Sequence, residues 1–208
     1  MTVMAILKIH PKTPQNRLIA QAAQLIKNGG VIAYPSDTTY ALAADLFSKK
    51  AIERISTIKK LDSSKLFSCI CYDFSKLSEY AFISNSHFRI MKHLLPGPYT
   101  FILKGKALLP KITLTRRKTI GIRMPDFPIV RSLYKAVDSP FLSCGTRLSD
   151  DEPLNDPQEI EDKLGHCIDL VIDGGKIPYA PSSIISLEEE LPVILREGCG
   201  DLSFFRTE

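Results

Sequence analysis

Apolar and polar positions group along this chain into blocks that predict helices and strands in turn. Residues 4–9 read as an apolar strand, and a helix follows in which apolar residues recur at helical spacing. Thr13-Pro14 supplies an N-cap and a first-turn proline for that helix, and Asn28-Gly29-Gly30 ends it. The next run, Val31 to Pro35, is continuously apolar, as in a strand buried between helices. The chain therefore opens as strand, helix, strand.

The alternation continues to the end of the chain. Ser48 and Ser84 are placed to cap two more helices, Pro128 begins another, and a last helix follows Asp156-Pro157. Further strands are predicted at 67–71, 99–105, 119–125, 141–145, 169–173, 182–188 and 192–198. Helices separate the early strands and late strands follow one another, which predicts an α/β fold with a mixed parallel and antiparallel sheet flanked by helices. No linker or repeat divides the sequence, so residues 1–208 are predicted to form a single domain.

Composition agrees with this fold class and narrows the setting. The chain is 44% apolar and 24% charged, which is ordinary for a globular protein able to bury a core. Its five cysteines form no Cys-x-x-Cys pair, which favours a reducing compartment over a disulfide framework or a zinc site. No apolar stretch approaches the ~20 residues that cross a bilayer, and no leader is recognised, so a cytoplasmic location is expected.

Positive charge is concentrated in the middle of the chain. Between Tyr80 and Met124 there is no Asp or Glu, whereas acids dominate from Asp150 onward. The bases of the middle section are Arg89, Lys92, Lys104, Lys106, Lys111, Arg116, Arg117, Lys118 and Arg123. A section of this kind attracts anions, which predicts a phosphate-bearing ligand.

Polar segments that follow predicted elements are the candidates for ligand contact. Residues 36–40 follow a buried strand, Lys59-Lys60 with Lys65 follows a helix, and 143–147 follows another strand. Loops at the carboxyl ends of strands hold ligands in open α/β sheets. The same residues also suit a turn, a solvated helix end and a packed strand end, so both interpretations stay open. Cys144 has no histidine at a recognisable spacing, and no catalytic residue is assigned.

Several segments, taken in order, resemble the YrdC family and more closely its YciO branch. The matching segments, which together span nearly the whole chain, are Tyr34 to Leu42, Pro96 to Phe101, Arg117 to Arg123, Pro181 to Ile185 and Arg196 to Gly198. The resemblance implies a twisted mixed sheet with a large concave, positively charged face. Catalytic members of the family make threonylcarbamoyl-adenylate from threonine, bicarbonate and ATP and release pyrophosphate, in a pathway that modifies tRNA. Some members are described as binding double-stranded RNA.

The resemblance also implies roles for individual residues. A threonine-like substrate would contact Ser36, Thr38 and Tyr40. Nucleotide and phosphate contacts would come from Lys59, Lys65, Arg123, Ser143, Arg147, Ser183 and Arg196. ATP would enter with Mg²⁺, held mostly by phosphate oxygens and water, and no tightly bound metal is expected.

Two departures from the family pattern fall in the nucleotide motifs. The family's Lys-x-Arg is Lys59-Lys60-Leu61 here, and its Ser-x-Asn is Gly145-Thr146-Arg147; Ala41 also stands where synthases usually carry glycine. A lost guanidinium removes a bidentate phosphate contact. Three hypotheses therefore stay open: a nucleotidyltransferase related to the synthases, a paralogue that binds tRNA or double-stranded RNA through Arg116, Arg117 and Lys118, and a scaffold for a protein partner.

Overall fold

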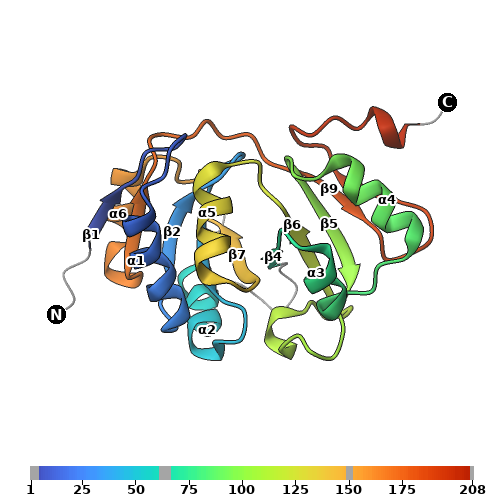
Figure 1. The fold of residues 1–208 in the computed structure, drawn as a ribbon, viewed down its shortest axis with the longest axis horizontal. Coiled ribbons are helices and arrows are strands. Elements are labelled where there is room, and N and C mark those ends of the chain that lie inside the picture. Colours follow the sequence, from blue (N-terminus) through green and yellow to red (C-terminus); the bar gives the residue numbers. More distant parts are fainter. Residues whose placement is uncertain (1–4, 61–66, 149–151, 207–208) are drawn as a thin grey trace.

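The computed structural model describes residues 5–60, 67–148 and 152–206, in which helices lie against one ten-stranded sheet (Figure 1). The strand order is β1-β8-β2-β3-β7-β4-β6-β5-β9-β10. The sheet contains parallel pairs, such as β4 with β6 and β5 with β9, and antiparallel pairs, such as β2 with β3 and β3 with β7. The predicted mixed sheet flanked by helices is confirmed. Within the described ranges, no helix is long and apolar enough to cross a membrane.

The elements have the following bounds. The strands are β1 (Ala5–Lys8), β2 (Ile32–Pro35), β3 (Tyr40–Asp45), β4 (Ser68–Ile70), β5 (Tyr99–Lys104), β6 (Thr119–Arg123), β7 (Phe141–Gly145), β8 (Leu170–Asp173), β9 (Ser183–Ser186) and β10 (Val193–Arg196). The helices are α1 (Asn16–Lys27), α2 (Lys49–Ile58), α3 (Phe74–Tyr80), α4 (Asn85–Leu94), α5 (Pro128–Val137) and α6 (Pro157–Leu164), with short 3₁₀ turns at Lys111–Thr113, Gly165–Cys167 and Ser203–Phe205.

The sequence-based prediction missed the strand β3 and the helix α3, and it assigned the wrong N-cap residue to α1. The strand β3 is rich in alanine, which has low strand propensity, and it forms because a turn at 36–39 returns it antiparallel to β2. The helix α3 is short and is capped by Asp73, whose carboxylate accepts hydrogen bonds from the Ser75 and Lys76 amides. The cap of α1 is Gln15 rather than Thr13, because the Thr13 hydroxyl bonds instead to His10 Nδ1 at 2.8 Å. That residues 1–208 fold as a single domain stays a prediction.

One face of the central strands is apolar and fully buried. Residues paired across a ladder share a face, and one such row runs through Ala44, Leu142, Cys69, Ile122 and Phe101. None of these five side chains is exposed to solvent. They belong to the same hydrophobic cluster as the buried residues of α1, α2 and α5. In Figure 1, α1 and α5 lie in front of the sheet, and the two helices pack against each other. This face is the main core.

The opposite face of the same strands carries small residues. The adjacent row runs through Ala43, Ser143, Ser68, Gly121 and Ile102. Ser143 and Ser68 project only a hydroxymethyl group and Gly121 no side chain. Small side chains in the middle of a twisted sheet leave space above them that larger residues would fill. This face therefore positions the candidate site.

The predicted cap of α2 is confirmed, because Ser48 Oγ accepts a hydrogen bond from the Ala51 amide at 3.4 Å. We expect Ser48→Ala to lower the free energy of unfolding by about 1 kcal/mol, since the amide loses its partner at the helix end. Urea denaturation would measure the loss. Lys50→Ala in the same helix is the control, because Lys50 is exposed and caps nothing. Equal stabilities of the two variants would contradict the capping role.

Candidate functional site

A cavity of about 310 Å³ lies over the small-residue face of the sheet. Its floor comes from strand positions on that face, namely Ala41, Ser68, Thr100, Ser143 and Gly145. Its cationic lining comes from four segments far apart in sequence: Lys59, Arg123, Arg147 and Arg196. No Asp or Glu is among the described residues that line it. The cavity therefore favours an anionic ligand.

Arg123, at the end of β6, is held by the turn that joins β2 to β3. Its Nη2 donates to Asp37 Oδ1 at 2.8 Å and to Thr38 Oγ1 at 3.0 Å, and the two charged side chains are only 10% and 11% exposed. The other Asp37 oxygen accepts the Asp126 amide at 3.1 Å. Arg123 Nε is buried with no hydrogen-bond partner among the described residues. Asp37 thus fixes the guanidinium beside Thr38 and offsets part of its charge.

Arg196, at the end of β10, is anchored on the chain before β9. Its Nε and Nη2 donate to the Ser182 carbonyl at 3.0 and 2.9 Å, and Ser182 Oγ shares a 2.8 Å hydrogen bond with Thr100 Oγ1. Burial lowers the pKa of Arg196, and the positive charges of Arg123 and Arg147 act in the same direction, against the opposing effects of Tyr179 and Cys199. Arg196 as a residue is exposed, so an anion can reach its guanidinium, which gains from that anion because other cations lie near it.

Lys59 follows the last residue of α2, and its side chain reaches the segment after β7. The ammonium group donates to the carbonyl oxygens of Gly145 and Arg147, and the residue is 6% exposed. Between them, Thr146 Oγ1 donates to the Leu154 carbonyl at 2.7 Å. The segment is thus held from two sides, and the Arg147 side chain lines the cavity.

Ser143 presents a hydroxyl to the floor of the cavity and shares a 2.6 Å hydrogen bond with Tyr34. Burial raises the pKa of Tyr34 to about 12, although the hydrogen bond from Ser143 opposes the rise. The phenol is therefore neutral near pH 7. The hydroxyl groups of Tyr34 and Ser143 are both neutral, so the floor of the cavity is polar but carries no charge here.

The cavity brings together six of the residues proposed from sequence as ligand contacts: Thr38, Lys59, Arg123, Ser143, Arg147 and Arg196. Ser36, Tyr40 and Ser183 do not line it. Ser36 Oγ donates to the Thr39 carbonyl at 2.7 Å within the turn, and the Tyr40 hydroxyl donates to the Gly175 carbonyl at 2.8 Å. Lys65 lies outside the described residues. Ligand contact by any of these residues stays a prediction.

Of the two neighbouring serines before and at the start of β9, Ser182 lines the cavity and Ser183, the residue proposed from sequence, does not. Neighbouring residues of a strand face opposite sides, and Ser182 and Ile184 line the cavity while Ser183 is fully buried and donates to the Gly200 carbonyl at 2.9 Å. Thr100 and Tyr179 also line the cavity and were missed. The period-two spacing of small residues in β3, β6 and β7 is the signal that would have indicated this face.

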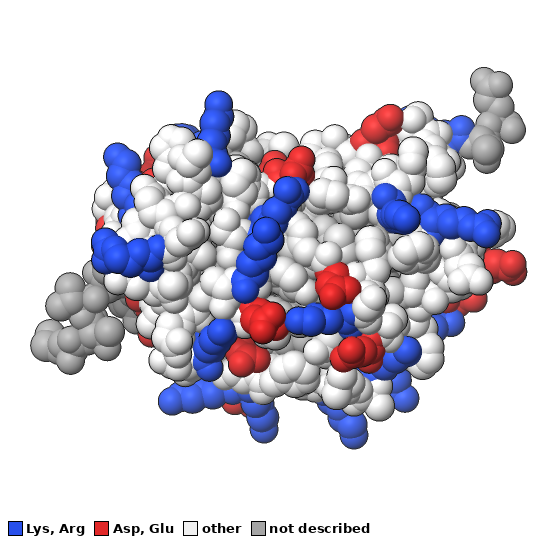
Figure 2. Space-filling model, in the orientation of Figure 1, with Lys and Arg blue, Asp and Glu red and all other residues white. Residues whose placement is uncertain are grey.

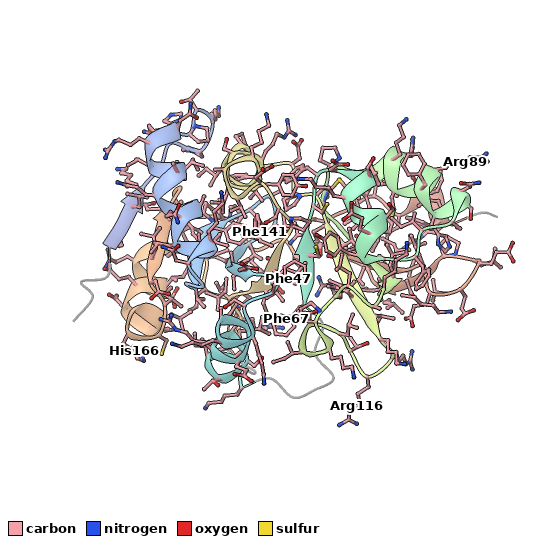
Figure 3. All side chains as sticks on the ribbon, turned by 60° about the horizontal axis from the view of Figure 1, so that its bottom comes forward. Phe47, Phe67, Arg89, Arg116, Phe141 and His166 are labelled. Carbon is pink, nitrogen blue, oxygen red and sulfur yellow. The ribbon has the colours of Figure 1, made fainter. Side chains whose placement is uncertain are left out.

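The basic middle section of the sequence does not form one patch. Figure 3 places Arg89 and Arg116 at well-separated corners of the molecule, and Lys104 is paired with Glu189 at 3.5 Å. Figure 2 shows basic side chains interspersed with acidic ones on the face it presents. Arg116 and Arg117 line a second hollow of about 420 Å³ that borders the cavity at Ile184, whereas Lys118 is exposed and not among its lining residues.

The comparisons with known proteins agree with this geometry. Residues 24–198 match the model of the Sua5/YciO/YrdC family, which is described as telomere recombination. The chain belongs to the Sua5/YciO/YrdC family. The resemblance inferred from the sequence motifs is thereby confirmed, and all four cationic residues of the cavity lie within the matched range.

The chain is similar to Sua5/YciO/YrdC proteins along most of its length. It is 45% identical to the uncharacterized protein YciO of Escherichia coli over 199 residues, 95% of this chain and 97% of that one. The crystal structure of E. coli YciO superposes with a TM-score of 0.93 at 43% identity, covering 98% and 100% of the two chains. A putative threonylcarbamoyl-AMP synthase of Methanocaldococcus jannaschii is 32% identical over 196 residues, 93% of this chain and 92% of that one.

A further structure in the Sua5/YciO/YrdC family holds a small-molecule ligand. It is P. abyssi Sua5 complexed with L-threonine, which superposes with a TM-score of 0.88 at 25% identity. The match covers 94% of this chain but 58% of the Sua5 chain. The chain is therefore related to the threonylcarbamoyl-AMP synthases.

Proposed function

We propose that this protein is a nucleotidyltransferase that binds ATP and a threonine-like amino acid in the cavity and forms a threonylcarbamoyl-adenylate. The observation that carries the proposal is the meeting of Lys59, Arg123, Arg147 and Arg196 in one hollow with no acidic residue among its described lining. Two relatives support the amino-acid half, since one is named a putative threonylcarbamoyl-AMP synthase and another was crystallised with L-threonine. We place this activity in the cytoplasm, within tRNA modification.

The proposed reaction has two steps. The amine of threonine attacks the carbon of bicarbonate-derived CO₂ and loses a proton, which gives a carbamate. A carbamate oxygen then attacks the α-phosphorus of ATP, the bond to the β-phosphate oxygen breaks, and pyrophosphate leaves with the electron pair. Negative charge accumulates on the departing pyrophosphate. Positioning and cationic stabilisation of that charge are what such a reaction asks of a protein.

The described residues supply these two requirements in different parts of the cavity. Thr38, whose hydroxyl accepts from Arg123, lies at the turn after β2 and would orient the amino acid. Arg196 and Arg147 would meet the phosphate oxygens, since the pKa of Arg196 is lowered by burial and by neighbouring cations. The Asp37 carboxylate is held by Arg123 and would not compete with the ligand for them.

We treat the Mg²⁺ that accompanies ATP as part of the substrate. The described residues contain no cluster of three or more His, Cys, Asp or Glu side chains able to bind one. Mg²⁺ is held by hard oxygen ligands and keeps several waters. The ion that accompanies ATP would therefore be coordinated by phosphate oxygens and water.

Incubation of the purified protein with ATP, threonine, bicarbonate and Mg²⁺ tests the proposal. We expect pyrophosphate release that depends on both threonine and bicarbonate, together with a threonylcarbamoyl-adenylate detectable by mass spectrometry. Omission of bicarbonate is the matched control, because ATP hydrolysis by a contaminant does not require it. Failure to detect either product above a protein-free reaction would count against the synthase activity. Calorimetry with ATP would then show whether nucleotide binding survives.

The second function that the structure leaves room for is binding of tRNA or double-stranded RNA. Arg116 and Arg117 line the hollow that adjoins the cavity, and their two positive charges outweigh that of Glu188, which also lines it, so a backbone phosphate is the ligand we propose there. The observed affinity would then fall steeply as salt rises, because neutralised phosphates release counterions. RNA binding of this kind without pyrophosphate release would replace the proposed enzyme with an RNA-binding paralogue.

A further inference from the structure

The Lys59 ammonium group bonds to two backbone carbonyls, although the residue also lines the cavity. Two of the three protons that a lysine ammonium can donate are directed at the carbonyl oxygens of Gly145 and Arg147. Lys59 is 6% exposed, so its ammonium group has little water to bond and depends on these carbonyls, although Gly145 and Arg147 are themselves exposed residues. A buried donor that loses its partners costs free energy, so these two hydrogen bonds tie the segment to the lysine.

The residue between the two carbonyls is held from the other side. Thr146 Oγ1 donates to the Leu154 carbonyl at 2.7 Å and to the Tyr40 carbonyl at 3.2 Å, and its amide also donates to Tyr40. Gly145 is the last residue of β7 and still pairs with Ala41 of β3, but an added Cβ there would meet nothing within 4 Å, so no side chain packs on that side of it. Hydrogen bonds from Lys59 and Thr146 therefore determine where the backbone of Arg147 lies.

We propose that Lys59 is a positioning residue that acts through Arg147, and that Arg147 makes the direct contact with the anionic ligand. The proposal rests on the function proposed above. It assigns different roles to two cations that both line the cavity: one orders the strand end by bonding its carbonyls, and the other directs a guanidinium at phosphate oxygens. A planar guanidinium can contact phosphate with two parallel hydrogen bonds, which a lysine cannot.

A double-mutant cycle on ATP binding distinguishes the two roles. We expect Lys59→Met and Arg147→Met each to weaken ATP binding about tenfold, which corresponds to about 1.4 kcal/mol. The double variant should bind no more weakly than Arg147→Met alone, because Lys59 then has nothing left to position. Lys60→Met is the control and should bind as the wild type does, since Lys60 is exposed and does not line the cavity. A double variant about a hundredfold weaker than the wild type would overturn the proposal.

Amide hydrogen exchange tests the positioning step without any ligand. Lys59→Met should speed exchange at Thr146 and Arg147 at least tenfold, whereas Arg147→Met and Lys60→Met should not. Lys59→Gln can still donate a hydrogen bond to one carbonyl, so its exchange rates should lie between those of the wild type and Lys59→Met. This variant replaces Lys59→Met in the test if the methionine variant does not fold. Unchanged exchange in both Lys59 variants would overturn the inference. If the wild type binds no ATP, the proposed function fails, and exchange still decides whether Lys59 orders the segment.

Discussion

An Asp37→Asn variant is expected to lose about 3 kcal/mol of unfolding free energy, because removing one member of a buried ion pair leaves the other uncompensated. Asp37 and Arg123 are 11% and 10% exposed and meet at 2.8 Å. Arg123 Nε already lacks a hydrogen-bond partner among the described residues. Without the Asp37 carboxylate, the charged guanidinium would keep its hydrogen bond to the neutral Thr38 hydroxyl but would have no counter-charge there. For a chain of this size the thermal midpoint should fall by roughly 6–12 °C.

The control for this prediction is Asp126→Asn. Asp126 also pairs with an arginine, Arg131 at 3.0 Å, but the two side chains are 66% and 47% exposed. Exposed pairs contribute about 0–1 kcal/mol. Thermal and urea unfolding should therefore separate the two variants clearly. Equal losses would mean that the buried pair with Arg123 adds no more than a surface pair does.

An Arg196→Met variant is expected to bind ATP about 10- to 100-fold more weakly than the wild type. A hydrogen bond to a charged group is worth about 1.5–3 kcal/mol, and each 1.4 kcal/mol changes a dissociation constant tenfold. The guanidinium is anchored by the Ser182 carbonyl, so it needs little ordering when a phosphate arrives. Calorimetric titration of ATP into the two proteins would measure the difference.

Arg206→Met is the matched control for Arg196→Met. Arg206 pairs with Glu197 at 2.7 Å, both side chains are largely exposed, and it does not line the cavity. Its loss should leave ATP affinity within about twofold, since an exposed charge is screened by salt. If Arg196→Met and Arg206→Met weaken ATP binding equally, the loss comes from the lower net charge of the protein, and Arg196 makes no specific contact with ATP.

Local sequence patterns were sufficient wherever a segment's own periodicity decides its structure. The apolar spacing of α1, the continuous apolar run of β2 and the capping serine of α2 each depend on neighbours a few positions away. Motif order likewise pointed to the family, because the matched segments are contiguous stretches of chain. The alanine-rich β3 was missed because its strand conformation comes from pairing with β2 and β7, not from its own residues.

The site depended on contacts that no local pattern contains. Lys59 meets the Gly145 carbonyl across 86 positions, and which of Ser182 and Ser183 faces the cavity depends on the register of β9 against β5. The acid-free stretch looked like one basic surface, yet the fold places Arg89 and Arg116 far apart. The sequence by itself determined the family and the order of all the helices and strands except β3 and α3. Only the tertiary structure decided which charges converge, because strand register sets the face and the neighbours of every side chain in the sheet.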